Sequence, residues 1–359
     1  MAGQDTSNRI LPVAGVHRSI AAGNGSGRTT TVERQYDEGP SNPHGRGSSE
    51  NRTIKAAPLL RCRRELTLST FNALTIREEA RAQELAACAK AVGISILGIQ
   101  EHRRVHAQSE VVYSMLEGMH LVTTSAWRDP VTNSAQGGVG LLLNSHARKA
   151  IRSVTPHGSR ILVAEFQGNP LTSVIVVYSP HNSSNDEDMD NFYAQLSSAI
   201  QSIPAHHFLA VLGDFNARVG KENETFAYHE ATNRNGQYLV DLAQQHRLII
   251  TNTAFRKRPG KQWTFRDRFT NEKRQLDYIL VRKKWRNSVL NTEAYSCFDS
   301  VNSDHRLVST KVRLSLRANK TTGRRVKHDW QTFSTNLDLQ QRYTVEVRNR
   351  YQTLKREEE

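Results

Sequence analysis

Apolar and polar residues alternate between Glu65 and Asn72, in the stretch ELTLSTFN, with the two-residue period of a half-buried β-strand. Apolar runs of strand length recur after it, and several of them end at an acidic or amide residue. These further candidate strands cover 94–99, 139–143, 161–166, 173–178, 208–212, 248–252, 276–281, 294–298 and 307–316. The pattern therefore predicts a domain that is rich in β-structure.

Only a few segments show helical spacing. Between Ile76 and Val92 apolar residues recur three and four positions apart, and Gly93 follows where a helix commonly ends. The same spacing predicts helices over 188–202 and 236–246. Helices this sparse cannot cover every strand of one doubly wound sheet. The predicted fold class is α/β, with two sheets packed face to face and the helices outside.

The two ends of the chain differ in composition from this central part. Residues 1–64 are mostly Gly, Ser, Asn, Thr and Arg up to about Lys55, too poor in large apolar side chains to offset the entropy lost on ordering. They are interpreted as a disordered leader, and the packed domain is predicted to span 65–317. Residues 318–359 are basic at first and are then predicted to be helical.

Charge adds a preference about partners. The 49 Lys and Arg residues against 35 Asp and Glu give a net charge of +14, which favours an anionic partner such as nucleic acid or an acidic membrane surface. The sequence shows no secretory signal and no apolar run of membrane-spanning length, so a soluble, intracellular protein is expected. Three widely separated cysteines suggest neither a disulfide framework nor a zinc site.

Acidic and amide residues stand at the ends of the candidate strands. The set is Asn72, Glu101, Asp214 with Asn216, Asp277, and Asp304 with His305. A single acid after a strand is more often a turn or capping residue, but loops at strand ends form clefts, so their recurrence indicates a site. Mg²⁺ prefers oxygen ligands, which Glu101, Asn72 and Asp304 can offer. A Mg²⁺ site, with Mn²⁺ as the alternative, is therefore predicted.

The other residues of this set suit proton transfer. An Asp such as Asp214 can take a proton from a water molecule that the amide of Asn216 orients. His305 is suited to stabilise a phosphate or to move a proton, and Asp277 to fix the tautomer of its ring. An adjacent Asp and His are equally typical of a surface turn.

A basic run lies between residues 256 and 286, where twelve Lys and Arg residues stand against three acids. Aromatic residues are interleaved with them, which suits a phosphate backbone with bases that stack, although a solvated charged loop is the alternative. The predicted DNA-binding residues are Arg256, Lys257, Arg258, Lys261, Arg274, Arg282, Lys283, Lys284 and Arg286.

Short motifs in a fixed order carry a family resemblance. They are Phe71-Asn72, Ile99-Gln100-Glu101, Tyr178-Ser179-Pro180, Gly213-Asp214-Phe215-Asn216, Gln275-Leu276-Asp277-Tyr278 and Ser303-Asp304-His305. Over roughly residues 65–316 the chain resembles the endonuclease/exonuclease/phosphatase superfamily. The stretches GDFNARVG, LIITNTAF, RQLDYILVRKKWRNSV and SDHRLV are most similar to the apurinic-type endonuclease domain of non-LTR retrotransposons and their craniofacial-development-protein-like relatives.

This resemblance implies a four-layer α/β sandwich, with two packed and mainly antiparallel sheets flanked by helices. It implies Mg²⁺-dependent cleavage of a DNA phosphodiester that leaves a 3′-hydroxyl and a 5′-phosphate. By the same resemblance, Glu101 with Asn72 and Asp304 would hold the metal.

The resemblance also assigns catalytic roles. Asp214 would activate the water, and Asn216 would orient the water or the phosphate. His305, paired with Asp277, would stabilise the developing charge, and Tyr178 would contact the scissile phosphate.

In such retrotransposons the nick primes reverse transcription of the element's RNA. The implied partner is double-stranded DNA, with element RNA and a reverse transcriptase in a parent polyprotein as further partners, and with no membrane. The chain lacks a polymerase motif, and its last segment resembles the linker that leads toward one. A nuclear location is expected, and the oligomeric state stays open.

Two alternatives remain, together with one departure from the family pattern. The chain is either an endonuclease, a phosphoester hydrolase of the same superfamily with another substrate, or a catalytically decayed copy that binds DNA or protein. LGDFNAR and RQLDYIL disfavour a lipid headgroup, because inositol-phosphatase relatives carry different blocks there. His181 stands where a small polar residue is commoner in relatives, which affects the expected substrate contacts.

Overall fold

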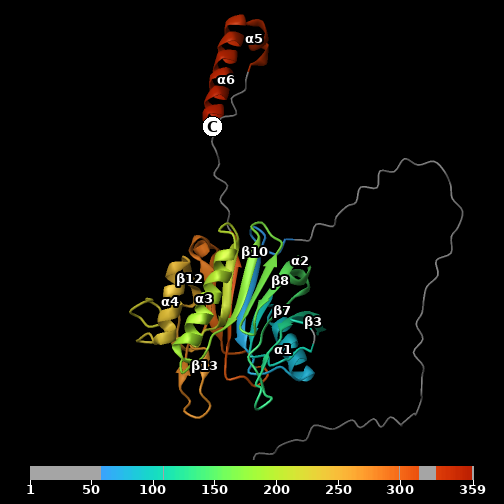
Figure 1. Cartoon of the computed structure of the whole chain (residues 1–359), viewed down its shortest axis with the longest axis vertical. Helices are drawn as coiled ribbons and strands as arrows, with labels where there is room; N and C mark the ends of the chain where they lie inside the picture. Colours follow the sequence, from blue (N-terminus) through green and yellow to red (C-terminus); the bar gives the residue numbers. More distant parts are fainter. Residues whose placement is uncertain (1–57, 108, 299, 315–328, 358–359) are drawn as a thin grey trace, which may run out of the picture. The chain divides into compact units, whose positions relative to one another are not determined.

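The computed structural model describes residues 58–107, 109–298, 300–314 and 329–357, and two β-sheets form the centre of the fold (Figure 1). The seven-stranded sheet has the order β16 (Val289–Tyr295), β17 (Leu307–Arg313), β1 (Glu65–Asn72), β2 (Ile96–Gln100), β7 (Val139–Leu143), β4 (Met119–Thr124) and β3 (Val111–Leu116). The six-stranded sheet has the order β12 (Leu248–Ile250), β15 (Asp277–Arg282), β11 (Phe208–Asp214), β10 (Thr172–Tyr178), β9 (Ile161–Phe166) and β8 (Ile151–His157). Only the pairs β1–β2 and β10–β11 among these strands are parallel, as a mainly antiparallel fold requires.

Helices and short hairpins complete the described fold. The helices are α1 (Glu79–Ala91), α2 (Ser145–Ala150), α3 (Asp186–Ser202), α4 (Arg234–Gln245), α5 (Trp330–Thr335) and α6 (Leu337–Glu357). The hairpins pair β5 (Trp127–Arg128) with β6 (Ala135–Gln136) and β13 (Phe265–Arg266) with β14 (Lys273–Arg274). Three short 3₁₀ segments are η1 (Thr251–Thr253), η2 (Pro259–Lys261) and η3 (Lys283–Ser288).

Three apolar layers separate four structural layers, which confirms the predicted sandwich. In β10, Val174 and Val176 point to the core between the sheets, whereas Ile175 packs on the α3 and α4 side. In β2, Ile96 faces the central core, and Leu97 faces the layer that α1 covers. Because side chains alternate along a strand, strands covered on both faces are apolar throughout.

Strand register brings the ends of several strands to one edge of the sandwich. Tyr178 pairs with Asp214 between β10 and β11, and Asp214 pairs with Asp277 between β11 and β15. In the other sheet, Asn72 pairs with Gln100 at the ends of β1 and β2. We call this the carboxylate edge, and we call the opposite ends of the same strands the far end.

Several elements differ from the sequence predictions. Strands β3, β4 and β8 and helix α2 were not predicted. Of these, β3 and β8 lie at sheet edges and alternate irregularly between exposed and half-buried positions, and α2 has only six residues. The strand predicted at 294–298 lies at Val289–Tyr295, and the strand predicted at 248–252 ends at Ile250 where η1 begins. The sequence pattern was too short at these positions to fix the boundaries.

The chain ends show one extension and one helical pair. Leu59 and Leu60 are buried in the central core, so the packed domain begins ahead of the predicted Glu65, whereas most of the predicted leader lies outside the described residues. Near the other end, α5 contacts α6 through the rings of Phe333 and Tyr343, 5.4 Å apart. Within the described ranges, no helix has both the length and the apolarity needed to span a membrane.

Candidate active site

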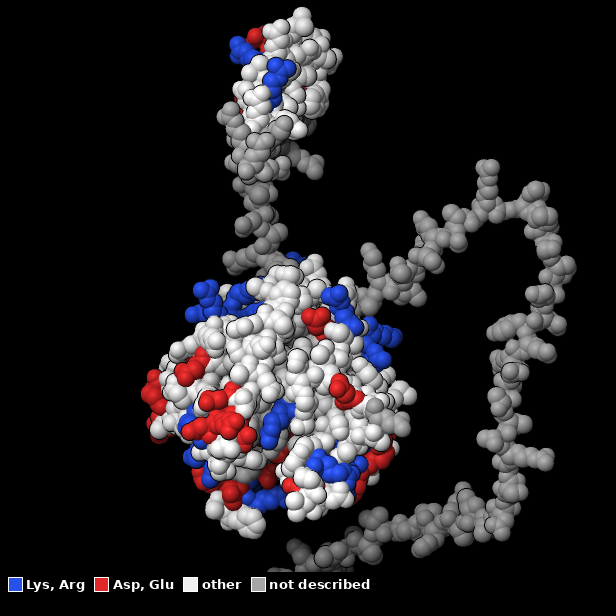
Figure 2. All heavy atoms as spheres, viewed as in Figure 1, with Lys and Arg blue, Asp and Glu red and all other residues white. Residues whose placement is uncertain are grey.

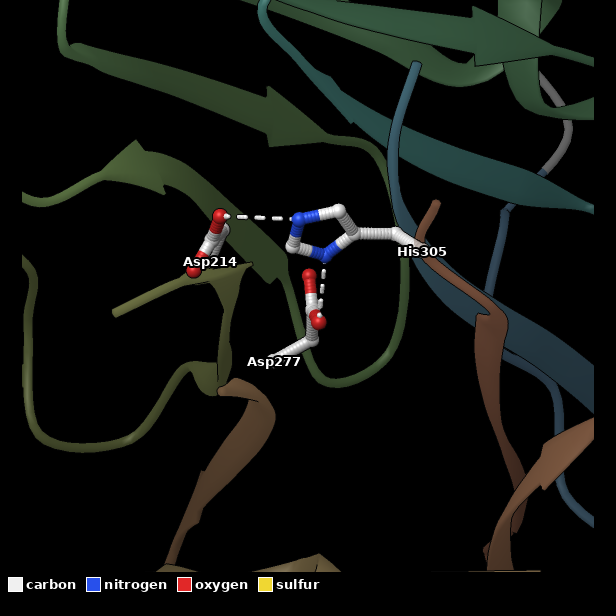
Figure 3. Close-up of side chains that lie close together, drawn as sticks. All are labelled: Asp214, Asp277 and His305. Carbon is white, nitrogen blue, oxygen red and sulfur yellow. Dashed lines mark hydrogen bonds and ion pairs between the residues drawn. The ribbon is translucent and has the colours of Figure 1, made fainter. Parts of the chain in front are cut away.

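Two aspartates and a histidine form a buried cluster at the carboxylate edge (Figure 3). His305 Nδ1 lies 2.9 Å from Asp277 Oδ2, and His305 Nε2 lies 3.8 Å from Asp214 Oδ2. The side chain of His305 is 7% exposed, and those of the two acids are almost fully buried. The imidazole ring therefore bridges two carboxylates away from bulk water.

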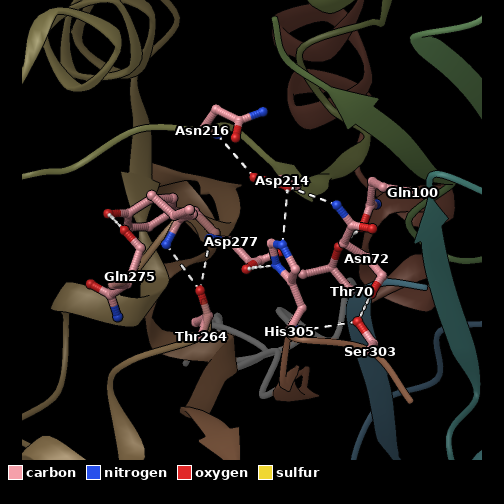
Figure 4. Close-up of polar contacts among 12 residues, drawn as sticks. Thr70, Asn72, Gln100, Asp214, Asn216, Thr264, Gln275, Asp277, Ser303 and His305 are labelled. Carbon is pink, nitrogen blue, oxygen red and sulfur yellow. Dashed lines mark hydrogen bonds and ion pairs between the residues drawn. The ribbon is translucent and has the colours of Figure 1, made fainter. Parts of the chain in front are cut away.

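Neighbouring backbone and hydroxyl groups hold this cluster in place (Figure 4). Asp214 and Asp277 are paired across β11 and β15, and the backbone N–H of Asp277 donates to Thr264 Oγ1 at 3.1 Å. The backbone N–H of His305 donates to Ser303 Oγ at 3.1 Å, and the Ser303 hydroxyl donates to the Asn72 carbonyl at 2.7 Å. The histidine loop is thereby fastened to the seven-stranded sheet and the acids to the six-stranded sheet.

Burial and mutual charge shift the protonation of the cluster. Burial and the negative charge of Asp277 raise the pKa of Asp214 to about 7, against the opposing effect of His305. Burial alone would lower the pKa of His305, but Asp277 and Asp214 raise it to about 10. The cluster therefore combines a base that ionises near neutral pH with a histidine that is protonated there.

Glu101 lies beside this cluster and is linked to it through an amide. Asn72 Nδ2 donates to Glu101 Oε1 and to Asp214 Oδ2, both at 2.9 Å. Tyr178 donates to the same Oε1 at 2.9 Å, and Arg103 donates to Glu101 Oε2 at 2.7 Å. Burial would raise the pKa of Glu101, but the hydrogen bonds from Asn72, Arg103 and Tyr178 lower it, so the carboxylate stays ionised.

The loop after β2 holds Glu101 in an uncommon backbone conformation. Glu101 has a φ of 52°, in the left-handed region that costs free energy for a non-glycine residue. The ring of His102 behind it accepts the N–H of Arg104 at 3.0 Å and lies against Gly138. A Cβ on Gly138, which has a φ of +86°, would approach the His102 ring to 2.5 Å. This contact braces the turn that presents Glu101.

Two cavities flank the cluster. One, of about 570 Å³, is lined by Glu101, Arg103, Trp127, Arg160, Tyr178 and His181 among others. The other, of about 440 Å³, is lined by Trp263, Arg266, Arg268, Asp304, His305 and Arg306 among others. His181, the residue that departs from the family pattern, has its Nε2 3.1 Å from the hydroxyl of Tyr178. Because Tyr178 donates to Glu101, His181 is linked to the Glu101 network. Basic and aromatic side chains thus line both sides of the buried acids.

The structure joins most of the predicted catalytic and metal-binding residues, with one difference in detail at Asp304. Asn216 holds Asp214 Oδ1 through its backbone N–H at 2.9 Å, and its side-chain Nδ2 donates to the Ser179 carbonyl at 2.9 Å. Asp304 Oδ2 lies 3.7 Å from Arg268 Nε, in the second cavity and not in the hydrogen-bond network of Glu101. Phe215, between Asp214 and Asn216, is fully buried as predicted.

The donor atoms suit a hard cation at Glu101. Its carboxylate is ionised and lines a cavity, and carboxylate and amide oxygens are the ligands that Mg²⁺ and Mn²⁺ accept. Asn72 Oδ1 accepts the N–H of Leu74 at 2.9 Å and retains a second lone pair. These residues therefore fit a divalent cation, with Asn72 acting also as a hydrogen-bond donor between Glu101 and Asp214.

Strand direction divides the predicted DNA-binding residues into separate groups. Arg274 lies in the β13–β14 hairpin and pairs with Glu272. Lys257 and Lys261 pair with Glu293 of β16. Arg256 and Arg258 stand next to Lys257 in the chain. The remaining members stand at the end of β15 or after it: Arg282, Lys283, Lys284 and Arg286. Because β15 begins at the carboxylate edge and ends at Arg282, the last four lie at the far end.

Sequence reasoning missed several supporting residues. Arg103 stands two positions after Glu101, and Ser303 precedes Asp304 within a recognised motif, so both were within reach of a closer inspection. Thr264 carries no such signal. Asn235 is also fully buried, and its Nδ2 donates to the carbonyls of Pro180 and Asn216, both at 3.1 Å, which only the tertiary contact reveals.

Comparison with known proteins gives a family model and several relatives. The model described as "Endonuclease/Exonuclease/phosphatase family" matches residues 69–299. Craniofacial development protein 2 of Bos taurus is 30% identical over 187 residues, which make up 51% of this chain and 31% of that protein. The chain thus spans about a third of the length of the curated relatives it matches.

Two solved structures share the fold at low sequence identity. The 3′ phosphatase NExo from Neisseria, solved with a product DNA hairpin, is 15% identical with a TM-score of 0.52, covering 69% of this chain and 100% of its own. The AP endonuclease LMAP from Leishmania major is 14% identical with a TM-score of 0.53, covering 70% of this chain and 89% of its own. At these identities the likeness establishes the sandwich architecture.

Proposed function

The chain belongs to the endonuclease/exonuclease/phosphatase family, and from this premise we propose that it is a metal-dependent endonuclease that hydrolyses a phosphodiester of double-stranded DNA. The membership and the likeness to craniofacial development protein 2 confirm the resemblance found in the motifs. The observation that carries the proposal is the buried Asp214–His305–Asp277 cluster between two cavities lined by arginines.

In this proposal Asp214 is the general base. Its pKa of about 7 lets its carboxylate take a proton from an attacking water near neutral pH. The backbone N–H of Asn216 and the amide of Asn72 hold its two oxygens and orient the free lone pairs. The hydrogen bonds therefore fix the direction from which the proton is accepted.

His305 supplies positive charge next to this base. With a pKa raised to about 10, the imidazolium is protonated at neutral pH and can stabilise the charge that develops on a phosphate oxygen. Asp277 Oδ2 accepts a hydrogen bond from the Nδ1–H of His305 and so directs Nε2 toward Asp214 and the substrate. Tyr178, whose hydroxyl donates to Glu101, lines the cavity and would contact the phosphate.

Glu101 with Asn72 would hold Mg²⁺, or Mn²⁺ in its place, whereas Asp304, the third predicted ligand, lies in the second cavity beside Arg268. The bound cation would neutralise charge on the phosphate and on the leaving oxygen. Arg103, which pairs with Glu101, and Arg160, whose guanidinium lies 5.3 Å from the Tyr178 ring, face the same cavity and are suited to bind neighbouring phosphates.

We also propose the products of the cleavage and its biological setting. Cleavage would leave a 3′-hydroxyl and a 5′-phosphate, as in the target nicking of a retrotransposon, with element RNA and reverse transcriptase as partners in the nucleus. Support comes from the retrotransposon-type motifs and from the product DNA hairpin that the structurally similar NExo binds. Residues 318–359, with α5 and α6 in their described part, are proposed as the segment that leads toward a polymerase.

Conversion of supercoiled plasmid to nicked circle tests this function. We expect nicking with Mg²⁺, none with EDTA, and a loss of about 10³-fold or more in Asp214→Ala because the base is removed. Asp241→Ala, which removes an exposed carboxylate of α4, serves as the matched control and retains nicking.

Other outcomes identify the two alternatives. Equal nicking by Asp214→Ala contradicts the proposed base. A folded protein that binds DNA without nicking it corresponds to the decayed copy, and hydrolysis of a phosphoinositide in the absence of nicking corresponds to the other substrate class.

A further inference from the structure

Six basic side chains gather at the far end of the sandwich. They come from the start of β8, the turn after α4, the end of β15 and η3, and we call them the far-end patch: Arg152, Arg247, Arg282, Lys283, Lys284 and Arg286. The N–H of Lys283 donates to the Arg247 carbonyl at 2.8 Å, and the charges of Arg152 and Arg282 both act on His207. Figure 2 shows Lys and Arg side chains on both sides of the end of the domain opposite the β13–β14 hairpin, with others nearer the hairpin.

The far-end patch is remote from the buried acids. Arg282 ends the strand that Asp277 begins, five residues earlier, and at about 3.3 Å per residue the two backbones are roughly 17 Å apart. Lys283 and Lys284 follow beyond that point. The far-end patch therefore lies at the opposite end of β15 from the Asp214 site and faces away from DNA that lies across the carboxylate edge.

Carbonyl groups, and not carboxylates, hold three of the six basic side chains of this patch. Arg282 donates to the carbonyl of Ile203 at 2.7 Å, after the end of α3, and Lys284 donates to the carbonyl of Ala205. Arg286 donates to the Ala254 carbonyl at 3.1 Å. No member of the patch forms an ion pair with any acid in the described part of the chain. Arg282, Lys284 and Arg286 are thus oriented, while the positive charge of the whole patch remains uncompensated.

The surroundings are themselves electropositive. Burial lowers the pKa of Lys284, and the positive charge of the neighbouring Arg282 lowers it further. Glu165 is the acidic side chain that acts on His207 in this region, and it is half-buried in β9. An anion at the patch would relieve this repulsion.

Aromatic rings lie beneath two of the cations. The Lys284 ammonium lies 5.0 Å from the centre of the Trp285 ring, and the Arg286 guanidinium lies 4.7 Å from the Phe255 ring. Both rings are partly exposed, and together with repeated cations they match the alternation of phosphate and base in a nucleic-acid strand.

We propose that the far-end patch binds a second nucleic-acid segment through its sugar-phosphate backbone, separate from the DNA that is cleaved at the carboxylate edge. The segment is either single-stranded RNA or a second stretch of DNA duplex, since both present the same phosphate chemistry. The site does not depend on catalysis, so it stands or falls independently of the proposed nuclease activity.

Fluorescence anisotropy with the full chain in EDTA tests this site. The probes are a labelled single-stranded RNA and a labelled DNA duplex, titrated over a range of salt concentrations, and sedimentation with phosphatidylserine vesicles tests a membrane surface in parallel. The variant Arg247→Gln/Lys283→Gln/Lys284→Gln leaves Arg282 and Arg286 in place, because these two are most closely tied to the fold. The control Lys90→Gln/Lys221→Gln/Lys311→Gln removes the same charge from exposed positions elsewhere.

For at least one probe, we expect the patch variant to bind more weakly than the control, with a salt slope smaller by about 2, because each lost phosphate contact lowers it by roughly 0.7 for a single strand. A loss for RNA alone assigns the site to RNA, and a loss for duplex assigns it to a second DNA segment. Equal binding by variant and control overturns the proposal, and so does a loss confined to phosphatidylserine vesicles. If the triple variant does not fold, Lys283→Glu alone provides the same comparison at an exposed position.

Discussion

Strand β15 begins with Asp277 at the carboxylate edge and ends with Arg282 at the far end, so one strand supplies two different electrostatic environments. At the carboxylate edge, cations such as His305 and Arg103 lie against carboxylates, and the charges are closely balanced. At the far end, Arg282 lies against carbonyls and its charge is not neutralised. The first arrangement tunes protonation, whereas the second leaves charge available to a polyanion.

The largest expected effect tests whether the carboxylate edge alone carries the chemistry. His305→Ala removes the imidazolium next to Asp214, and nicking should fall by about 10³-fold. His207→Ala is the matched control, because His207 is also a buried histidine, with Nδ1 3.0 Å from Ser173 Oγ, but at the far end. Plasmid nicking measured for both variants should fall only for the first. A similar loss in both would mean that the two ends are not functionally distinct.

The coupling inside the cluster predicts a shift in pH dependence. Activity requires an ionised Asp214 and a protonated His305, so the rate should rise through about pH 7 and fall near pH 10. The negative charge of Asp277 raises both pKa values. Asp277→Asn removes that charge, so both limbs of the profile should move to lower pH, with the maximal rate reduced by roughly 10- to 100-fold. Nicking rates measured from pH 5 to 10 check this, and an unmoved profile would exclude the coupling.

The same comparison explains what the sequence could predict. Alternating apolar residues located strand ends such as Asn72 and Asp214, and the parallel pairing of β1 with β2 and of β10 with β11 brings such ends to one edge. The basic run from 256 to 286 looked like one surface in the sequence. It is divided in the structure because β15 runs the length of the sheet between Asp277 and Arg282.

Other parts of the site depend on contacts that no local pattern contains. The Ser303 hydroxyl reaches the carbonyl of Asn72, 231 positions away in the sequence. Thr264 supports Asp277 from a loop whose own sequence is not distinctive. The elevated pKa of Asp214 likewise arises from burial and from the charge of Asp277, which appear only when β11 and β15 pair. The residue types were predictable, but their electrostatic coupling was not.

A smaller expected effect distinguishes two costs of a side chain at Gly138: the unfavourable backbone angle and the contact with the His102 ring. Gly138 and Gly93 both have positive φ angles, of +86° and +73°, but only at Gly138 would a Cβ meet another group, the His102 ring at 2.5 Å. Both Ala variants should lose about 1 kcal/mol in the free energy of unfolding from the unfavourable φ. Gly138→Ala should in addition reduce nicking, because displacement of His102 disturbs the turn of Glu101. Denaturant unfolding and nicking assays compare the two, and equal nicking would show that His102 does not brace this turn.

The smallest expected effect tests how much the basic residues at the far end contribute to the free energy of unfolding. Arg282 donates to carbonyls after the last turn of α3. A cation there satisfies free carbonyl acceptors and interacts favourably with the negative end of the helix dipole. Arg282→Ala should therefore lower the free energy of unfolding by about 1 kcal/mol, and Arg282→Lys, which keeps the charge but loses the planar set of donors, by roughly half as much. Lys283→Ala, at an exposed position of η3, should leave stability unchanged. Urea unfolding of the three variants measures this order. If Lys283→Ala were as destabilising as Arg282→Ala, the basic residues of this end would serve to hold the fold, and their charge would not be free for a nucleic acid.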